Sequence, residues 1–391
     1  MLRFLTAGES HGPSLVAILE GMPAGLPLCA EDVNSQLRRR QQGHGSGGRM
    51  EIERDAARIA GGVLNGLTTG APIAIEIENR DFANWQDREI VPLTVPRPGH
   101  ADLTGAIKYG YRDLRLALER ASARETAARV AVGAICRRMV AEFGVTIGGY
   151  VVWIGSAQAL LADDLPLPTR VARAEENDLR CPAPAAAEAM RACIDQARAA
   201  GDTLGGVFEL VALGLPPGLG SYVHWDRRLD ARLMAAIGSI PAVKGVEIGP
   251  AFENAARRGT EVHDEIYEEG GDLVRRTNRA GGLEGGITTG QSLIVRAAMK
   301  PISTTLTPLR SVDLASGEPA QTRYERSDIC AVPRAVVVGE AMVAFVLADA
   351  LLEKLGGDSL DEMRPRFATL RRGTVGDLEM DNEPWRFAGS P

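Results

Sequence analysis

Two of the five histidines lie in short turn sequences that could present them to a substrate. His11 follows Ser10 in the glycine-bounded sequence GESHG, and His100 lies in RPGHAD. Imidazole changes its protonation near neutral pH, so either side chain could act as a general acid or base. A turn histidine can equally be solvated, and the sequence leaves both interpretations open. No HExxH-type spacing connects the histidines, so no metal site is predicted.

A cluster of arginines lies at the front of an apolar segment at residues 120–143. Arg120, Arg124 and Arg129 add positive charge to the N-terminus of an expected helix, which favours an anion site. Arginines on a solvated helix face are the alternative, and spacing alone does not separate the two.

A second basic region begins at Arg40, the last residue of a segment of helical composition. The glycine-rich sequence GHGSGG, which contains Ser46, follows it and leads to Arg49. It formally satisfies GxGxxG, but it follows a helix instead of a strand, so we do not predict a dinucleotide site there. We expect a basic loop.

The segment at residues 120–143 has the pattern of a long buried helix. Ser122 and Glu125 have capping-box spacing, which predicts a helix start near Ala123. Apolar residues recur at helical spacing up to Phe143, and many alanines would let neighbouring backbones approach closely. At 1.5 Å per residue the helix would span about 30 Å.

A second helix is expected after the sequence RSD, where Arg326 and Asp328 mirror Arg120 and Ser122. Asp328 could belong to a site or could only cap this helix, and capping is the simpler interpretation. The sequence KPIST from Lys300 could likewise be a strand exit or a loop that binds phosphate.

An internal repeat organises the chain. AGGVLNGLTTG at 60–70 is echoed by AGGLEGGITTG at 280–290, and GMPAGL near residue 21 is echoed by GLPPGL near 214. The order is kept, so we predict two similar halves, about 1–150 and 204–355, within one domain at 1–391. The segment 156–203 would be an insertion with a surface helix, and a polar tail would follow residue 370. The predicted fold is α+β, with two antiparallel sheets enclosing a layer of helices.

Composition excludes several classes of protein. The net charge of −7 argues against general nucleic-acid binding. No run of about 18 apolar residues suggests a membrane span, and the N-terminus lacks the apolar core of a signal peptide, so we expect a cytoplasmic protein. The five scattered cysteines have no CxxC spacing, so neither disulfides nor zinc are expected.

Several long motifs resemble the chorismate synthase family. They occur in order between residue 2 and about residue 370: GESHG, RPGHAD, RASARETAARVAVGA, VKGVEIG, AGGLEGGITTGQ, MKPIST and RSDICAVPRAVVVGE. The resemblance implies a β-α-β sandwich and a homotetramer. It also implies an anti-1,4-elimination of phosphate from 5-enolpyruvylshikimate 3-phosphate that gives chorismate, the last step of the shikimate pathway. That reaction needs reduced FMN without net redox change.

The resemblance also assigns roles to residues. His11 would protonate the departing phosphate, and His100 would protonate or hydrogen-bond the reduced flavin. Asp328 would help to deprotonate flavin N5, with Ser10 and Ser122 supporting the hydrogen-bonding network. The implied FMN contacts are Arg120, Ala121, Ser122, Pro241, Ala242, Gly285, Lys300, Pro301, Ile302, Ser303, Thr304 and Arg326. The implied substrate or NADP contacts are Arg40, Ser46, Arg49, Arg124 and Arg129.

Two positions depart from the family pattern. Ser46 stands where the family commonly has arginine, which weakens a pyridine-nucleotide or substrate contact there. Pro241 replaces a residue that is usually polar, so a flavin contact there would use the backbone. The sequence does not decide whether the protein reduces its flavin with NADPH or relies on an external flavin reductase.

Two other functions remain as alternatives to the lyase. One is an FMN-dependent oxidoreductase, and the other is a non-enzymatic protein that binds anions. Flavin binding would distinguish either enzyme from the non-enzymatic protein that binds anions. Phosphate release without consumption of reductant would distinguish the lyase from the oxidoreductase.

Overall fold

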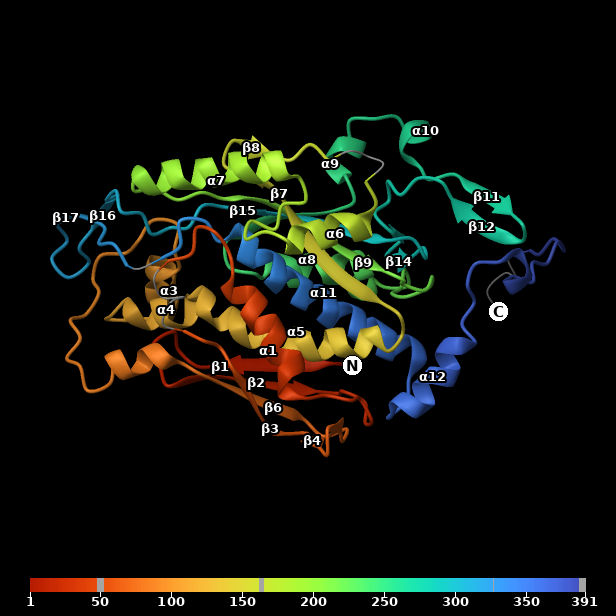
Figure 1. The fold of residues 1–391 in the computed structure, drawn as a ribbon, viewed down its shortest axis with the longest axis horizontal. Helices are drawn as coiled ribbons and strands as arrows, with labels where there is room; N and C mark the ends of the chain where they lie inside the picture. The colour runs from red at the N-terminus through yellow and green to blue at the C-terminus, as the bar shows by residue number, and fades with distance from the viewer. Residues whose placement is uncertain (48–52, 162–164, 326, 387–391) are drawn as a thin grey trace.

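Two antiparallel sheets enclose a layer of helices, as predicted (Figure 1). The computed structural model describes residues 1–47, 53–161, 165–325 and 327–386. The central layer contains α1 (Ala30–Gln41), α5 (Thr126–Ala141), α8 (Leu229–Gly238) and α11 (Val332–Leu355). Arg49 and Arg326, two predicted ligand contacts, lie outside the described residues.

The first sheet has one buried face and one solvated face. Its order is β1 (Arg3–Ala7), β2 (Ser14–Glu20), β6 (Ile73–Glu78) and β3 (Ala57–Gly61). Alternate residues of β6, namely Ile73, Ile75 and Ile77, are buried, as the two-residue period of a strand requires. The buried face packs against α5 and α1.

The second sheet has buried apolar residues on both faces. Its order is β10 (Val243–Ile248), β15 (Leu293–Met299), β9 (Gly206–Leu213), β7 (Thr146–Ile154) and β8 (Ala157–Gln158). Phe208 and Leu210 join the main core, whereas Val211 joins a second cluster with Ala174. Ala174 belongs to α6 (Leu167–Glu175), which packs on the outer face of β7, whereas α7 (Pro184–Ala199) contacts β7 and β8 and adds its buried residues to the main core. The predicted surface helix is therefore confirmed as α7.

Helices α5 and α11 approach each other closely, as the small residues of the sequence predict. A Cβ atom placed on Gly133 of α5 would lie 2.3 Å from the Cβ of Ala341 in α11, so glycine is needed at the crossing. Helix α11 is long and apolar enough to cross a membrane, but 89% of the 18-residue apolar stretch that meets this criterion is buried inside the structure. It is the core helix of the fold.

The predicted helix start near Ala123 with Ser122 as the cap is confirmed, but the first turn is 3₁₀ and the α-helix itself begins at Thr126. Helix α4 (Arg115–Ala121) ends directly before Ser122, which is extended, and a 3₁₀ turn, η2 (Ala123–Glu125), precedes α5. Ser122 Oγ accepts a hydrogen bond from the Arg124 N–H at 3.3 Å and thereby caps the 3₁₀ turn. Glu125 does not complete a capping box, because its carboxylate pairs with Arg129 at 2.9 Å.

The start of α11 also differs from the capping interpretation of Asp328. The helix begins at Val332 with Ala331 at the N-cap, and Pro333 occupies its first turn, where no backbone N–H is required. Asp328 precedes this N-cap by three residues and therefore does not cap the helix.

The repeated motifs adopt the same local structure. Hairpin β4 (Val63–Leu64) and β5 (Leu67–Thr68) corresponds to β13 (Leu283–Glu284) and β14 (Ile287–Thr288). Thr68 Oγ1 donates to the Pro23 carbonyl at 2.6 Å and accepts from the Leu26 N–H at 2.9 Å. Thr288 Oγ1 donates to the Pro216 carbonyl at 2.7 Å and accepts from the Leu219 N–H at 2.8 Å.

Strand order repeats as well. The order β1-β2-β6-β3 in the first sheet matches β7-β9-β15-β10 in the second. Because β7 begins at Thr146 and pairs with β9, a repeat defined by strand pairing starts at β7, before the predicted boundary at residue 204.

The remaining elements lie at the periphery of the sandwich. They are η1 (Arg80–Asn84), α3 (Asp102–Tyr109), η3 (Trp225–Arg227), α9 (Ala251–Asn254), α10 (Gly259–Val262), β11 (Ile266–Glu269), β12 (Asp272–Arg275), β16 (Arg310–Val312), β17 (Pro319–Gln321), α12 (Leu360–Ala368) and η4 (Val375–Asp377). After η4 the described chain, up to Arg386, has no further helix or strand.

Candidate active site

A cavity of about 660 Å³ opens where the N-terminal ends of α5 and α11 meet. Its volume lies within the range of roughly 300–1,000 Å³ that is usual for cofactor and substrate pockets. Predicted site residues from distant parts of the sequence line it: Ser10, His11, Arg40, His100, Ala121, Ser122, Arg124, Pro241, Ala242, Lys300, Ile302, Ser303, Thr304 and Asp328.

His11 is held by Glu119 of α4. The two Glu119 carboxylate oxygens lie 2.7 Å from His11 Nδ1 and 2.7 Å from the His11 main-chain nitrogen. Burial raises the pKa of Glu119, but the contacts with His11 outweigh this effect and leave the pKa below its ordinary value. The Glu119 carboxylate is therefore ionised and able to orient the imidazole near neutral pH.

His100 is held in a similar way by Asp102. His100 Nδ1 lies 2.5 Å from Asp102 Oδ1, and Arg97 Nε donates to Asp102 Oδ2 at 2.8 Å. Burial raises the pKa of Asp102, but hydrogen bonds from His100 and Arg97 lower it well below its usual range. Both cavity histidines thus have an ionised carboxylate at Nδ1.

Asp328 is fixed by a main-chain donor and by a cation. Its Oδ1 accepts the Gly47 N–H at 2.9 Å, and its other oxygen forms an ion pair with Arg334 of α11. The contact with Gly47 ties the glycine-rich segment after Arg40 to the predicted proton-transfer residue.

Ser10 and Ser122 connect the two sides of the cavity. Ser10 Oγ donates to Ser122 Oγ at 3.0 Å, and the Ser10 N–H donates to the Glu119 carbonyl at 3.1 Å. The turn after β1 is thereby tied to the end of α4.

Two of the predicted anion-binding arginines already have acidic partners. Arg124 is buried and lies 2.6 Å from Asp55 and 3.6 Å from Glu53. Arg40 lies 3.5 Å from Asp55 and donates to Thr126 Oγ1 at 3.0 Å. These contacts balance the arginine charges within the protein and hold α1 against the start of α5.

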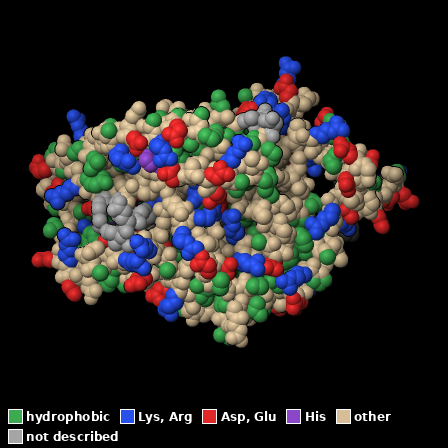
Figure 2. Space-filling view, viewed as in Figure 1, with side chains coloured by type: hydrophobic (Ala, Val, Ile, Leu, Met, Phe, Trp, Pro, Cys, Tyr) green, Lys and Arg blue, Asp and Glu red, His purple; other side chains and the backbone are tan. Residues whose placement is uncertain are grey.

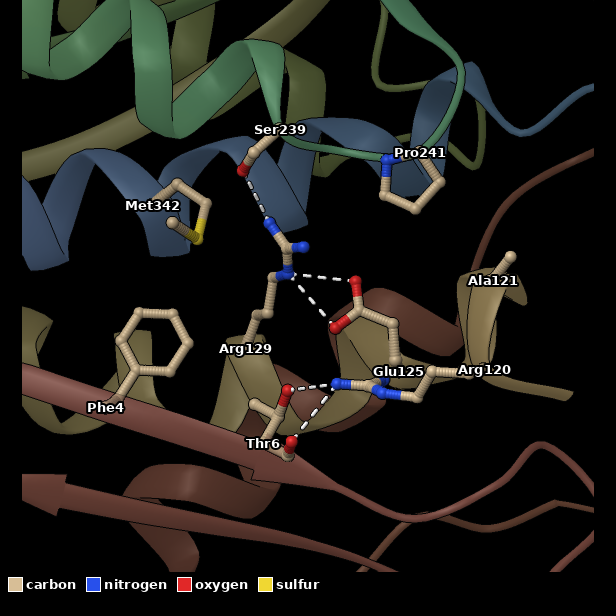
Figure 3. A pocket seen from close by; sticks show the side chains of 9 residues that line it. All are labelled: Phe4, Thr6, Arg120, Ala121, Glu125, Arg129, Ser239, Pro241 and Met342. Atoms are coloured by element: carbon tan, nitrogen blue, oxygen red, sulfur yellow. Dashed lines mark hydrogen bonds and ion pairs between the residues drawn. The ribbon is translucent and has the colours of Figure 1, made fainter. Parts of the chain in front are cut away.

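Arg120 and Arg129 point into a neighbouring pocket of about 400 Å³ (Figure 3). Arg120 donates to Thr6 Oγ1 at 2.8 Å, and Arg129 donates to Ser239 Oγ at 2.7 Å. Ala121 and Pro241 line both pockets, so the two adjoin.

Besides Arg120 and Arg129, three other described residues among those predicted are not brought to the wall of the main cavity. Gly285 lies in the turn between β13 and β14, where an added Cβ would meet only Tyr222, at 4.0 Å. Ser46 Oγ donates to the Gly43 carbonyl at 2.6 Å, and Pro301 lies outside the lining formed by its neighbours. Their ligand contacts stay predictions.

Several lining or supporting residues are absent from the sequence predictions. They are Glu53, Asp55, Trp85, Arg97, Asp102, Glu119, Lys244 and Arg334. Arg97 and Asp102 flank His100 in RPGHAD, and Glu119 directly precedes Arg120, so proximity to a motif could have identified these three. Lys244 and Arg334 lie within the motifs VKGVEIG and RSDICAVPRAVVVGE, so the motifs could also have identified them, whereas Glu53, Asp55 and Trp85 depend on contacts between distant segments.

Lys300 adds positive charge to the cavity. Burial and, to a smaller extent, the nearby Lys244 lower the pKa of its ammonium group. A bound anion would relieve that repulsion.

Outside the cavity, acidic and basic side chains are interspersed over the face shown in Figure 2. Among the described residues, no group of three or more His, Cys, Asp or Glu side chains could hold a metal ion.

Known proteins are similar to this chain over nearly its whole length. The sequence model of the chorismate synthase family matches residues 2–352. A chorismate synthase from Aquifex aeolicus (strain VF5) is 55% identical over 383 residues, covering 94% of this chain and 96% of that protein. Another, from Desulforudis audaxviator (strain MP104C), is 57% identical over 373 residues, covering 93% and 95%.

A solved structure is similar over the same extent. A crystal structure of chorismate synthase matches with a TM-score of 0.78 and 48% sequence identity, and the match covers 94% of this chain and 96% of that chain. The resemblance inferred from the motifs is confirmed, and the chain belongs to the chorismate synthase family.

Proposed function

We propose that this lyase eliminates phosphate from 5-enolpyruvylshikimate 3-phosphate, giving chorismate, with its chemistry in the 660 Å³ cavity. The main support is that His11, His100 and Asp328 line this one cavity, although they come from three distant segments. In the reaction the C3–O bond breaks and its electrons leave with phosphate, while a proton leaves C6. The enzyme must therefore supply two groups that act on the same substrate. One donates a proton to the departing phosphate, and the other accepts the proton from C6.

His11 is the proposed proton donor to the departing phosphate. Its Nδ1 is engaged by Glu119, so a proton given to a ligand would come from Nε2. Asp328 is the proposed carboxylate on the proton-accepting side, where it accepts the Gly47 N–H and pairs with Arg334. Ser10 and Ser122 tie the turn that contains His11 to the end of α4.

The cavity suits reduced FMN. Leu118, Ile240, Met299 and Val338 give it apolar walls, and the loop at 300–304 adds hydroxyl groups and the Lys300 charge. This combination matches a flat aromatic ring with an anionic tail. When bound, reduced FMN supplies electron density that assists the loss of phosphate and is recovered within each turnover. His100, held by Asp102, would donate a hydrogen bond to it.

Substrate anions would meet the basic side of the cavity. We place the substrate near Arg40, with Arg49 of the adjoining loop as a further contact. Arg124 would act mainly by holding Asp55 and Glu53 in place, because it lies 2.6 Å from Asp55 and 3.6 Å from Glu53, whereas Arg40 lies 3.5 Å from Asp55.

Phosphate release per electron supplied tests the proposed reaction. Enzyme and FMN are reduced with limiting dithionite under anaerobic conditions, excess substrate is added, and phosphate and flavin absorbance are followed together. Phosphate should far exceed the electrons supplied, and the flavin should remain reduced. Phosphate that stops at one equivalent per electron pair would favour an oxidoreductase, and oxidised FMN without dithionite is the control.

We also propose a cytoplasmic homotetramer. Leu5 and Ile18 pair across β1 and β2 on the solvated face of the first sheet and are 60% and 43% exposed, which supports an apolar subunit contact. Light scattering during size exclusion would test the assembly.

Whether NADPH or an external flavin reductase supplies electrons would be tested by adding NADPH alone to the oxidised holoenzyme.

A further inference from the structure

Glu119 makes three hydrogen-bonding contacts with the turn that contains His11. Its carboxylate oxygens each lie 2.7 Å from a His11 nitrogen, one in the ring and one in the main chain. Its main-chain carbonyl also accepts the Ser10 N–H at 3.1 Å. One residue of α4 therefore sets the position of the turn and the orientation of the imidazole.

The opposite side of the imidazole is also restricted. The ring of Trp85 lies 4.2 Å from that of His11, centroid to centroid, and Arg115 lies over Trp85 at 5.3 Å. Rotation that would exchange the two ring nitrogens must break the bond to Glu119 and displace Trp85.

From this geometry we propose that Glu119 is the positioning residue for His11. This rests on the proposed function, in which His11 is the acid. An ionised carboxylate at Nδ1 keeps the neutral ring protonated at Nδ1 and stabilises the doubly protonated ring. During the reaction the Nε2 proton passes to a phosphate oxygen as the C3–O bond breaks. The neutral ring then keeps its Nδ1 proton, which it donates in a hydrogen bond to Glu119. Solvent restores the proton at Nε2.

Other charged side chains lie near His11 and Glu119 and would also affect the pH dependence of kcat. Arg115 Nη1 lies 4.0 Å from Glu119 Oε1, and Arg88 lies over Trp85 at 5.8 Å. Glu9, in the same turn, has its side chain against Gly12. These groups are unchanged by a substitution at Glu119, so they form a constant background.

The main test is Glu119→Gln in the full-length holoenzyme. Turnover should fall roughly 10- to 10³-fold, while FMN affinity should change less than about twofold. The alkaline limb of the kcat profile should move to lower pH, because the protonated ring loses its carboxylate partner. Unchanged turnover or an unmoved limb would overturn the proposal.

A double mutant separates this proposal from the proposed function. His11→Ala alone should lower turnover about 10²- to 10⁴-fold. Adding Glu119→Gln to that variant should cost little more, because the two residues act as one unit. Independent losses would overturn the role of Glu119. Normal turnover in His11→Ala would instead overturn the acid role on which the proposal rests.

Asp226→Asn is a matched control, because Asp226 holds His224 at 2.8 Å on an exposed segment outside the cavity. It should leave turnover unchanged. If Glu119→Gln folds poorly, ¹⁵N NMR of histidine-labelled wild-type protein gives an independent answer, with His11→Ala assigning the signals. Neutral His11 should be protonated at Nδ1, and protonation at Nε2 would refute the proposal.

Discussion

Each candidate proton-transfer residue is held by a neighbour of opposite charge. Glu119 holds His11, Asp102 holds His100, and Arg334 pairs with Asp328. Because each partner also makes protein contacts of its own or lies in a packed helix, the reactive groups have little rotational freedom. These contacts therefore provide a fixed geometry at the site.

Asp328→Asn tests whether the charge of Asp328 is needed. Asparagine can still accept the Gly47 N–H, but it cannot accept a proton or balance Arg334. We expect kcat to fall by at least about 10²-fold, with a loss of at most a few degrees in Tm. Steady-state kinetics and thermal melting measure the two effects. Normal kcat with a large fall in Tm would mean that Asp328 has only a structural role.

At the scale of elements, the crossing of α5 and α11 determines where the cavity lies. Both helices begin at its wall, since Ser122 and Thr126 line one side and Ala335 and Val338 line the other. Small residues at the crossing therefore affect the site without touching it.

Gly133→Ala should destabilise the protein. The new Cβ would lie 2.3 Å from Ala341 Cβ and 2.4 Å from its Cα, so the helices would have to separate. We expect a loss of about 1–3 kcal/mol in the free energy of unfolding, measured with urea. Gly238→Ala in α8 is the control, because only Val246 lies nearby, at 3.9 Å. It should be neutral or slightly stabilising, and equal effects would argue against a packing cause.

The repeated hairpins predict equal roles for two threonines. Thr68→Val and Thr288→Val each keep the side-chain volume but leave a buried carbonyl and a buried N–H without the hydroxyl. Each should cost about 1–3 kcal/mol of unfolding free energy. The double variant should show the sum, because the two sites share no hydrogen-bond partner. Strongly unequal losses would contradict the structural equivalence of the hairpins.

At the scale of the whole molecule, Glu175 links the outer helices to the core. It accepts from Arg39 of α1 and pairs with Arg180, while Arg39 also binds Glu340 of α11. Burial raises the pKa of Glu175, but hydrogen bonds and charge from Arg39 and Arg180 outweigh it and lower the pKa from 4.5 to about 2.

The sign of this shift predicts acid sensitivity. A carboxylate whose pKa is lower in the folded state stabilises the protein above its unfolded pKa, and this stability is lost as pH falls from 4.5 towards 2. Glu175→Gln should therefore be less stable than wild type at pH 6. The difference should shrink as the pH falls towards 2, which urea unfolding across this range would show. A constant difference would indicate lost packing in place of lost charge.

The core of the whole molecule also indicates how the domain is organised. We propose that residues 1–391 form one domain of two similar halves, because α5 and α11 share one core between the two sheets. Among the helices of 156–203, α6 packs on the outer face of β7 and α7 adds buried residues to the main core.

Much of this protein was determined by the sequence alone. Alternation in β6, small residues in α5 and the paired threonine motifs follow from local periods, which do not depend on distant contacts. The ordered motifs also predicted the family and therefore the reaction. The residues that line the cavity were largely among those motifs.

Only the tertiary structure decided how the charged residues pair. Glu125 has capping-box spacing, yet it binds Arg129; Asp328 has the type of an N-cap residue, yet it binds Arg334. Glu119 reaches His11 across 108 positions, and Arg124 reaches Asp55 across 69. A carboxylate can satisfy several donors within reach, and which donors are within reach depends on how the sheets and helices pack. Local spacing contains no information about that choice.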